Sequence, residues 1–522
     1  MPRSLVKSTG IVGAMTLVSR ILGFVRDMLI ASFFGAGAGV DAFLVAWRIP
    51  NLGRRMFAEG AFSQAFVPVF TEARSQRTLE EQRHLVSVVS GTLSGVLLLV
   101  TIVGTAAAPL LMMLFAPGFG WGTPKHDLGV HMLHLTFPYL LLISLTALMS
   151  GVLNSYGKFA IPAATAVLLN ICMIAAIFID SKTVEVLAWS VLVAGVLQLA
   201  FQAPSMARLG LLPRPRWAWH DPEVRHIIKL MLPILFGSSI GQISLLLDTV
   251  LASFLANGSV SWIYFADRVM EFPLGMFSIA LATVILPSLA THHAKRSATA
   301  FSDTLDWSLR SLLVVGLPAM VALAVLAGPL VSTLFGHARF DNHDVRMTQW
   351  ALIGFALGFM GFSLVRVLIP AFYARQETRI PVRYGVIALS VGMVMSVVLV
   401  GVMLLTGFAA PHMGLALSTS INAWVNAGLL FRRLRRDRVY RPRKGWGAFG
   451  WRLLAANLAM GIVIAWMAGG LAGWLYVPTL DRVAHLLEIV VAGAVVYFGT
   501  LWLCGMRLSH FKSPAAAVDG PV

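Results

Sequence analysis

Fourteen stretches of this chain are apolar enough to cross a bilayer, and the first two of them carry arginines. Arg20 and Arg26 interrupt the first stretch, and Arg48, Arg54 and Arg55 lie in the second. A charge at the centre of a bilayer costs about 2.5–3.5 kcal/mol on insertion scales. The presence of several such charges in apolar stretches is explained if they face a water-filled cavity and bind an anion. The sequence therefore predicts a polytopic membrane protein with a cationic internal site.

Composition supports this class. The chain is 58% hydrophobic and 12% charged, with 46 glycines, and small residues let membrane helices pack closely. A net charge of +17 would suggest nucleic acid in a soluble protein, but here the cations lie mainly in short loops between spans, so we expect no nucleic-acid partner. The two cysteines, Cys172 and Cys504, lie inside apolar segments and indicate no disulfide framework.

A membrane-spanning helix needs about 20 mainly apolar residues. The second and eighth expected spans are interrupted by glycine or proline. The expected all-α protein has fourteen transmembrane helices at 9–34, 41–69, 86–116, 129–154, 159–180, 186–206, 227–255, 262–290, 307–335, 348–373, 384–406, 412–431, 449–475 and 484–505.

Lysine and arginine orient these spans, because they concentrate on the cytoplasmic side. The termini and the even-numbered loops hold 26 of them, eight in the 432–446 loop alone, and the odd-numbered loops hold 5. An even number of spans places both termini on one side. We therefore expect both termini in the cytoplasm. The basic loop has two interpretations, a patch for anionic lipid or nucleic acid and a topology-fixing loop, and we favour the second.

Three motifs recur at nearly one offset within the first twelve spans. Asp27-Met-Leu-Ile-Ala-Ser-Phe matches Asp248-Thr-Val-Leu-Ala-Ser-Phe (248 − 27 = 221), and Phe57-x-x-Gly60-x-Phe62-Ser63 matches Phe272-x-x-Gly275-x-Phe277-Ser278 (272 − 57 = 215). Ile161-Pro162 matches Ile380-Pro381 (380 − 161 = 219). The order and spacing predict a duplication of six spans. Six is an even number, so the two copies are parallel repeats, a transporter architecture in which the passenger binds between the lobes.

The resulting organisation has six parts. They are an N-terminal lobe (1–206), a cytoplasmic linker (207–226), a C-terminal lobe (227–431), a basic cytoplasmic loop (432–447), a final helix pair (448–505) and a disordered tail (506–522).

The intramembrane charges differ between the two lobes. The first supplies Arg20, Arg26, Asp27, Asp41, Arg48, Arg54, Arg55 and Glu59, and the second supplies Asp248, Asp267, Arg268, Glu271 and Arg366. One interpretation is that these charges pair with each other and hold helices together, and it stays open for the aspartates. In the first lobe the cations outnumber the acids, so pairing cannot neutralise them all. Arginine also presents a planar fork of donors that suits a pyrophosphate.

Other chemistry finds little support. No Gly-x-x-x-x-Gly-Lys-Ser/Thr motif is present, so we expect no ATP hydrolysis by this chain. His131 and His134 lie one helical turn apart without a third ligand nearby in sequence, so we expect no metal site.

Two long segments carry a family resemblance. Residues 19–70, from SRILGFVRD to AFVPVF, resemble the N-terminal signature of the MurJ/MviN lipid II flippases, and SVSWIYFADRVMEFPLGMF at 259–277 resembles the signature of their eighth span. The likeness extends over essentially the whole chain. It implies a member of the multidrug/oligosaccharidyl-lipid/polysaccharide (MOP) exporter superfamily in the bacterial inner membrane. Such a protein would move undecaprenyl-pyrophosphate-linked disaccharide-pentapeptide from the cytoplasmic to the periplasmic leaflet by alternating access, for peptidoglycan synthesis and cell shape.

The resemblance also assigns roles to residues. Essential cavity arginines map onto Arg20, Arg26, Arg54 and Arg268. Supporting acidic and polar positions map onto Asp27, Asp41, Asn51, Glu59, Ser261, Asp267 and Glu271, and Arg48 and Arg55 join them from the charge pattern. The last two spans would form a groove for the lipid tail.

The coupling ion and the partners are less constrained. Some relatives hold sodium between spans seven, eleven and twelve, and Asp248 could be the acid of span seven. Span eleven offers only Ser390 and Ser396 as polar side chains, so we expect membrane potential and no bound cofactor. We expect a monomer that contacts lipid II and membrane lipids, and a cell-division or elongation partner stays open. The alternatives are a flippase for another polyprenyl-pyrophosphate glycan and a membrane-embedded glycan polymerase or ligase, which would need catalytic carboxylates on a large outward loop.

Overall fold

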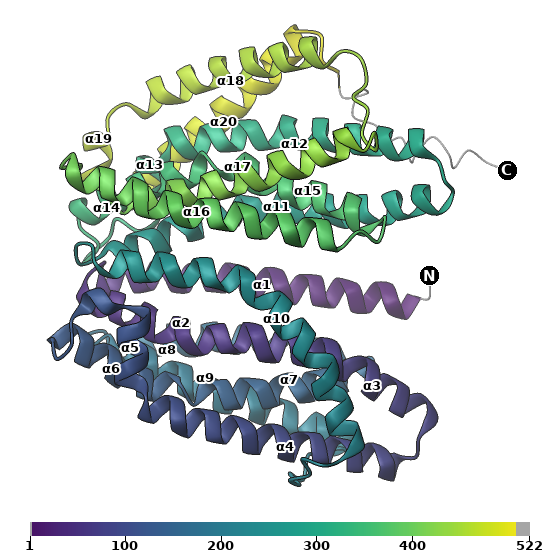
Figure 1. Ribbon diagram of the computed structural model, residues 1–522. Coiled ribbons are helices and arrows are strands. Elements are labelled where there is room, and N and C mark those ends of the chain that lie inside the picture. The colour runs from purple at the N-terminus through teal and green to yellow at the C-terminus, as the bar shows by residue number, and fades with distance from the viewer. Residues whose placement is uncertain (1–2, 508–522) are drawn as a thin grey trace. The chain divides into compact units, whose positions relative to one another are not determined.

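The computed structural model describes residues 3–507, except for the side chains of residues 3–9, 11, 56–59, 236–245 and 276–284. The described residues are almost entirely helical and contain no β-strand (Figure 1). Each of the fourteen expected spans lies mostly in helix, and several of them are divided between two helices. Among the described residues, nine helical spans are long and apolar enough to cross a membrane, which makes this a multi-pass membrane protein. The count of fourteen stays a prediction, and nearly all of the expected tail lies outside the described residues.

The chain forms two compact units, Met1–Ser261 with Ala338–Phe340, and Trp262–His337 with Asp341–Val522. Unit 1 contains α1 (Arg3–Phe34), α2 (Ala38–Gly53), the π-helix η1 (Arg54–Phe62), α3 (Ser63–Gln76), α4 (Leu79–Ala106), α5 (Ala108–Phe115), the 3₁₀ turn η2 (Pro117–Phe119), α6 (Pro124–Thr136), α7 (Tyr139–Ser155), α8 (Ala160–Ile179), α9 (Glu185–Arg208) and α10 (Pro222–Ser253).

Unit 2 begins within the first turn of α11 (Ser259–Ala294). It continues with α12 (Ala298–Val325), α13 (Ala327–Leu334), α14 (Asn342–Ala356), α15 (Phe359–Tyr373), α16 (Arg379–Leu405), α17 (Met413–Arg436), α18 (Trp446–Ala468), α19 (Ala472–Leu475) and α20 (Thr479–Leu503).

The boundary between the units differs from the expected lobe boundary at 206–227. The seventh expected span is α10, and it packs against η1, α3, α5 and η2 within unit 1. The sequence repeat shows where the second copy begins, but it does not say which helices the first element of that copy contacts. The six-plus-six division of the lobes therefore stays a prediction about the repeat, and the compact units follow a different division.

The core of unit 1 gathers where α3, α4 and α7 meet. Phe62, Phe66 and Phe70 form a stacked ladder with centroids 5.2 and 5.6 Å apart, and all three are buried. The expected linker 207–226 lies along α4, because the backbone N–H of Arg216 donates to the carbonyl of Ser87 at 3.0 Å. A Cβ on Gly91 would lie 2.2 Å from the backbone of Arg216, so this close approach requires glycine.

Unit 2 has two apolar clusters, one among α11, α12, α15 and α17 and one among α12, α18 and α20. The basic loop between α17 and α18 is fixed to α12. The buried carboxylate of Asp306 accepts from the Tyr440 hydroxyl and the Trp446 indole, each at 2.8 Å, and pairs with Arg310 at 2.8 Å. This loop is therefore anchored at the start of the final helix pair.

The order of helices supports the sequence repeat. A short helix follows a long one at the same place in each half, α5 from Ala108 and α13 from Ala327 (327 − 108 = 219). The next span is broken in both halves, and its second part begins at Tyr139 in α7 and Phe359 in α15 (359 − 139 = 220). These offsets agree with those of the sequence motifs, although the motifs did not include the breaks.

Candidate functional site

The first helix carries two of the predicted arginines in different environments. The Arg26 guanidinium donates to Asp27 Oδ1 through Nε at 2.9 Å and through Nη2 at 2.7 Å, and the Asp27 side chain is 2% exposed. Arg20 is exposed, and it has no hydrogen-bond or ion-pair partner among the described side chains. Part of the cationic character of α1 is therefore held by a carboxylate, and part of it is uncompensated.

Arg26 has a second partner from a distant helix. Its Nη1 donates to the amide oxygen of Asn170 on α8 at 2.9 Å. The amide nitrogen of Asn170 donates to the backbone carbonyl of Ser19 at 3.0 Å. Asn170 thus bridges two turns of α1 and is itself 6% exposed.

The second expected span contains the irregular helix that its sequence indicated. After Pro50 the α-helix gives way to the nine-residue π-helix η1, which begins at Arg54. Such segments are uncommon and often mark functional sites. Arg54 Nε donates to Asn51 Oδ1 at 2.9 Å, and Arg48 donates to Thr249 on α10. Arg55 is exposed, and the side chain of Glu59 lies outside the described residues.

Asp41 is the centre of a buried junction in unit 1. Its Oδ1 accepts from the backbone N–H of Ser261 at 2.9 Å and the Ser261 hydroxyl at 2.7 Å. Its Oδ2 accepts from the backbone N–H of Gly258 at 2.8 Å and pairs with Lys125 at 2.9 Å. The carboxylate therefore caps the N-terminus of α11 from α2, where a negative charge is favoured.

In unit 2 the predicted cluster on α11 is formed in part. Arg268 pairs with Glu271 at 2.7 Å and lies over the ring of Tyr264 at 4.8 Å. Asp267 is half-buried. Arg366 on α15 donates to the carbonyl of Leu274 at 3.4 Å, which places it against the same helix.

The candidate ion-coupling residues are distributed over several helices. Asp248 is half-buried at the end of α10. On α16, Ser396 is buried and shares a 2.6 Å hydrogen bond with Ser418, and Ser390 bonds to the carbonyl of Val386 at 3.0 Å. Both span-eleven hydroxyls thus have protein partners in this structure.

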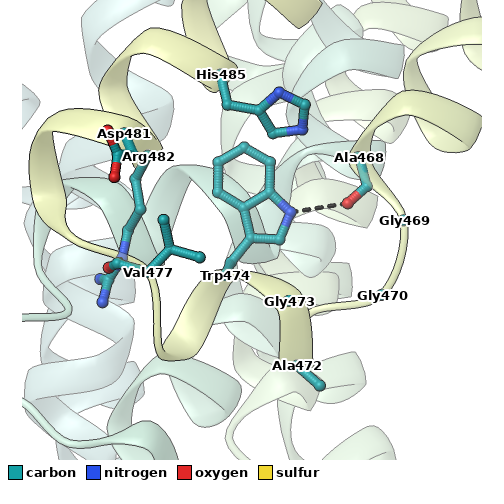
Figure 2. A pocket seen from close by; sticks show the side chains of 10 residues that line it. All are labelled: Ala468, Gly469, Gly470, Ala472, Gly473, Trp474, Val477, Asp481, Arg482 and His485. Carbon is teal, nitrogen blue, oxygen red and sulfur yellow. Dashed lines mark hydrogen bonds between the residues drawn. The ribbon is translucent and has the colours of Figure 1, made fainter.

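A pocket of about 550 Å³ lies at one end of the final helix pair (Figure 2). The Trp474 indole donates to the Ala468 carbonyl at 2.8 Å, and His485 stacks on Trp474 with centroids 5.1 Å apart. Arg482 points away from these rings, and its guanidinium donates to the carbonyls of Leu475, Val477, Ser332 and Gly336. Its buried charge fixes the turn before α20 to the end of α13.

The structure joins four pairs of predicted site residues, which are Arg26–Asp27, Asp41–Ser261, Arg54–Asn51 and Arg268–Glu271. None of the described contacts joins the four candidate arginines directly to one another. Sequence reasoning missed Asn170, Lys125 and Thr249. Asn170 carried a usable signal, because an amide in the middle of an apolar span needs a hydrogen-bond partner.

The two longest expected outward loops are short in the structure. Residues 117–128 contain η2 and the start of α6, and residues 336–347 contain the start of α14.

Comparison with known proteins identifies the family. The family model described as "Lipid II flippase MurJ" matches residues 30–484. A probable lipid II flippase MurJ from Vibrio cholerae is 41% identical over 98% of this chain and 98% of its own length. A structure of lipid II flippase MurJ in an inward closed conformation has a TM-score of 0.76 at 24% identity, covering 94% of this chain and 99% of that one.

The fold extends to a wider group of transporters. An inward-facing multidrug resistance MATE transporter of the MOP superfamily has a TM-score of 0.64 at 13% identity, over 81% of this chain and 95% of its own. With a family match over most of its length and relatives above 40% identity, the chain belongs to the MurJ lipid II flippase family.

Proposed function

We propose that this protein is a transporter that moves lipid II across the bacterial inner membrane by alternating access and catalyses no covalent step. The family assignment supports the substrate. The arginines support the manner of recognition, because the pyrophosphate of lipid II is an anion and Arg20, Arg26, Arg54 and Arg268 are permanent cations within apolar helices.

Arg20 carries this proposal. It is a guanidinium within an apolar helix, and it has no protein partner among the described residues. A buried or membrane-embedded cation without a counter-charge is costly, so an anionic passenger would stabilise it. Arg26 contributes a second guanidinium from the same helix, and Asp27 limits its cost when no passenger is bound.

The remaining assignments complete the proposal. Both termini lie in the cytoplasm, the chain crosses the membrane fourteen times, and the final pair α18 and α20 accepts the lipid tail. Asp27, Asp41, Arg48, Asn51, Arg55, Glu59, Ser261, Asp267 and Glu271 support the cavity. The protein works as a monomer, and membrane potential favours the conformation that receives the head group.

Complementation of a strain depleted of its own flippase tests the proposal. Arg20, Arg26, Arg54 and Arg268 are each changed to alanine and to lysine, and lipid II is labelled separately in each leaflet. Loss of export is expected from each alanine variant. The lysine variants should also fail where two donors of the fork are used, because lysine keeps the charge but not the geometry.

Arg346→Ala is the matched control, because Arg346 is exposed on α14 and makes no contact with a candidate site residue. Membrane levels are compared by blot. Normal export by well-expressed Arg20→Ala, Arg26→Ala, Arg54→Ala and Arg268→Ala would refute recognition by arginine. Export of another polyprenyl-pyrophosphate glycan with lipid II left inside would instead favour the alternative passenger.

A further inference from the structure

One side chain outside the predicted site fixes the orientation of Arg26. Ser19, Gly23 and Arg26 follow one another on one face of α1, at spacings of four and three residues. Asn170 on α8 lies against this face. It accepts from Arg26 Nη1 at 2.9 Å and donates to the Ser19 carbonyl at 3.0 Å, so both ends of the amide are used.

Glycine at position 23 allows this approach. A Cβ there would lie 3.7 Å from the amide of Asn170, already in van der Waals contact, so a larger side chain would displace the amide. The Asn170 amide therefore packs directly against α1 beside Arg26.

Asp27 and Asn170 have different effects on Arg26. Asp27 binds the Nε and Nη2 edge and cancels charge, whereas Asn170 binds Nη1 and is neutral. A guanidinium held by two groups on different edges cannot rotate about its long axis. The amide therefore orients the cation without adding a second counter-charge.

The internal repeat offers a comparison within the same molecule. At the repeat offsets, Arg26 corresponds to Leu247 (26 + 221 = 247) and Asn170 corresponds to Leu389 (170 + 219 = 389). The second copy thus has leucine at both positions, and Leu389 is buried.

We propose that Asn170 is a positioning residue for the passenger, which holds the Arg26 guanidinium in the orientation that binds the pyrophosphate. This inference rests on the proposed function. Asn170 contacts the arginine and not the passenger, so its effect should pass through Arg26.

Asn170→Leu and Asn170→Ala test it in the full-length protein in nanodiscs, with purified lipid II as the probe. Leucine is apolar and close in size to asparagine, so this variant should still fit an apolar span. Binding should weaken roughly tenfold, in keeping with one hydrogen bond to a charged group. In an Arg26→Ala background the same change at position 170 should have no further effect.

Gln202→Leu is the matched control, because Gln202 is a buried amide in unit 1 that donates to Ser150 at 2.8 Å and contacts no arginine. It removes a buried amide that makes no hydrogen bond to Arg26, so it should keep wild-type binding. Wild-type binding by Asn170→Leu, or an equal loss in the presence and absence of Arg26, would overturn the positioning role. Failure of the wild-type protein to bind lipid II would instead overturn the proposed function.

Discussion

At the scale of single residues, Asp41 forms the centre of a buried polar junction. Four donors converge on one carboxylate that is 1% exposed, and one of them is the ammonium of Lys125. Lys125 also bonds to Asn257 at 2.9 Å and lies 4.1 Å from the centre of the Phe119 ring. The junction therefore joins α2, the start of α6 and the turn before α11.

Lys125→Met should lower the free energy of unfolding by roughly 3 kcal/mol, because it leaves a buried carboxylate without its counter-ion while keeping the contact with Phe119. Thermal unfolding of the purified protein in detergent measures this. Lys182→Met, which changes an exposed lysine of another loop, should have an effect below about 0.5 kcal/mol. Equal effects of the two changes would show that the Asp41–Lys125 pair contributes nothing.

The sequence located polar side chains within apolar spans, but it did not give all their partners, and it did not show that Arg20 and Arg55 are exposed. Arg268 and Glu271 are one helical turn apart, so their pair could be anticipated, whereas adjacent residues such as Arg26 and Asp27 do not ordinarily face each other on a helix. Asp41 and Lys125 are 84 residues apart, and Arg26 and Asn170 are 144 residues apart. Such contacts depend on which helices pack together, and one sequence does not supply that information.

At the scale of elements, the linker between α9 and α10 is an ordered strap against α4. Arg83 Nε donates to the Gly210 carbonyl at 2.6 Å, and Gly91 and Gly95 face the backbone of Arg216 and the ring of Trp217. Composition alone indicated only a polar linker. The close approach of Gly91 and Gly95 to Arg216 and Trp217 depends on how the linker packs on α4, which composition does not give.

Gly91→Ala should lift this strap, because its Cβ would overlap the backbone of Arg216 and overpacking costs about 1–3 kcal/mol. Limited trypsin digestion should then cleave faster after Arg216. Gly428→Ala serves as the control, since its Cβ meets nothing within 4 Å. Unchanged cleavage in Gly91→Ala would mean that the strap already leaves α4 in solution.

The basic loop gives an element-scale prediction on pH. Burial, and then the hydrogen bond to Asp306, raise the pKa of Tyr440 above its ordinary value of about 10. The folded protein therefore holds this proton more tightly than the unfolded chain does. The resulting stability is complete below pH 10 and is lost as pH rises towards the higher folded pKa, by up to about 1.4 kcal/mol per pH unit.

Tyr440→Phe should reduce this loss, and unfolding of both proteins between pH 9 and 11.5 measures it. Tyr476→Phe, at a residue that is 82% exposed, should leave the pH dependence unchanged. Identical curves for wild type and Tyr440→Phe would contradict a link between the loop and Asp306.

Helix breaks were predictable in part. The sequence indicated the irregular second span, where η1 follows Pro50. It also held the signal for the breaks before α5 and α13, because Pro109 and Pro329 lie near the starts of these helices and proline cannot donate to the preceding turn. Hydropathy joined each pair into one span, since it measures apolarity and not backbone geometry.

At the scale of the whole molecule, the charge pattern predicts the direction in which the chain crosses the membrane. Replacement of Lys444 by cysteine should give a thiol inside the cell, and replacement of Arg346 should give one outside. Both positions are exposed in the structure, whereas Tyr440 and Phe340 nearby are buried and would report poorly. The test uses intact cells that produce the protein with Cys172 and Cys504 replaced. An impermeant maleimide should then label position 346 only.

Permeabilised cells should label both positions, which confirms that each thiol is reactive. Labelling of position 444 in intact cells would overturn the cytoplasmic placement of the basic loop and, with it, the expected arrangement of spans.

The bond between Arg26 and Asn170 also has a consequence for synthesis. A ribosome adding about 5–20 residues per second makes the second partner roughly 7–30 s after the first, because 144 residues separate them. During this interval we expect α1 to lie in the insertion channel while Arg26 still lacks its hydrogen bond to Asn170. We expect nascent chains that stop at residue 158 to crosslink to the insertion channel through position 20, and chains that extend past α9 to have left it. The first helix of this protein would then be among the last to reach its final packed position.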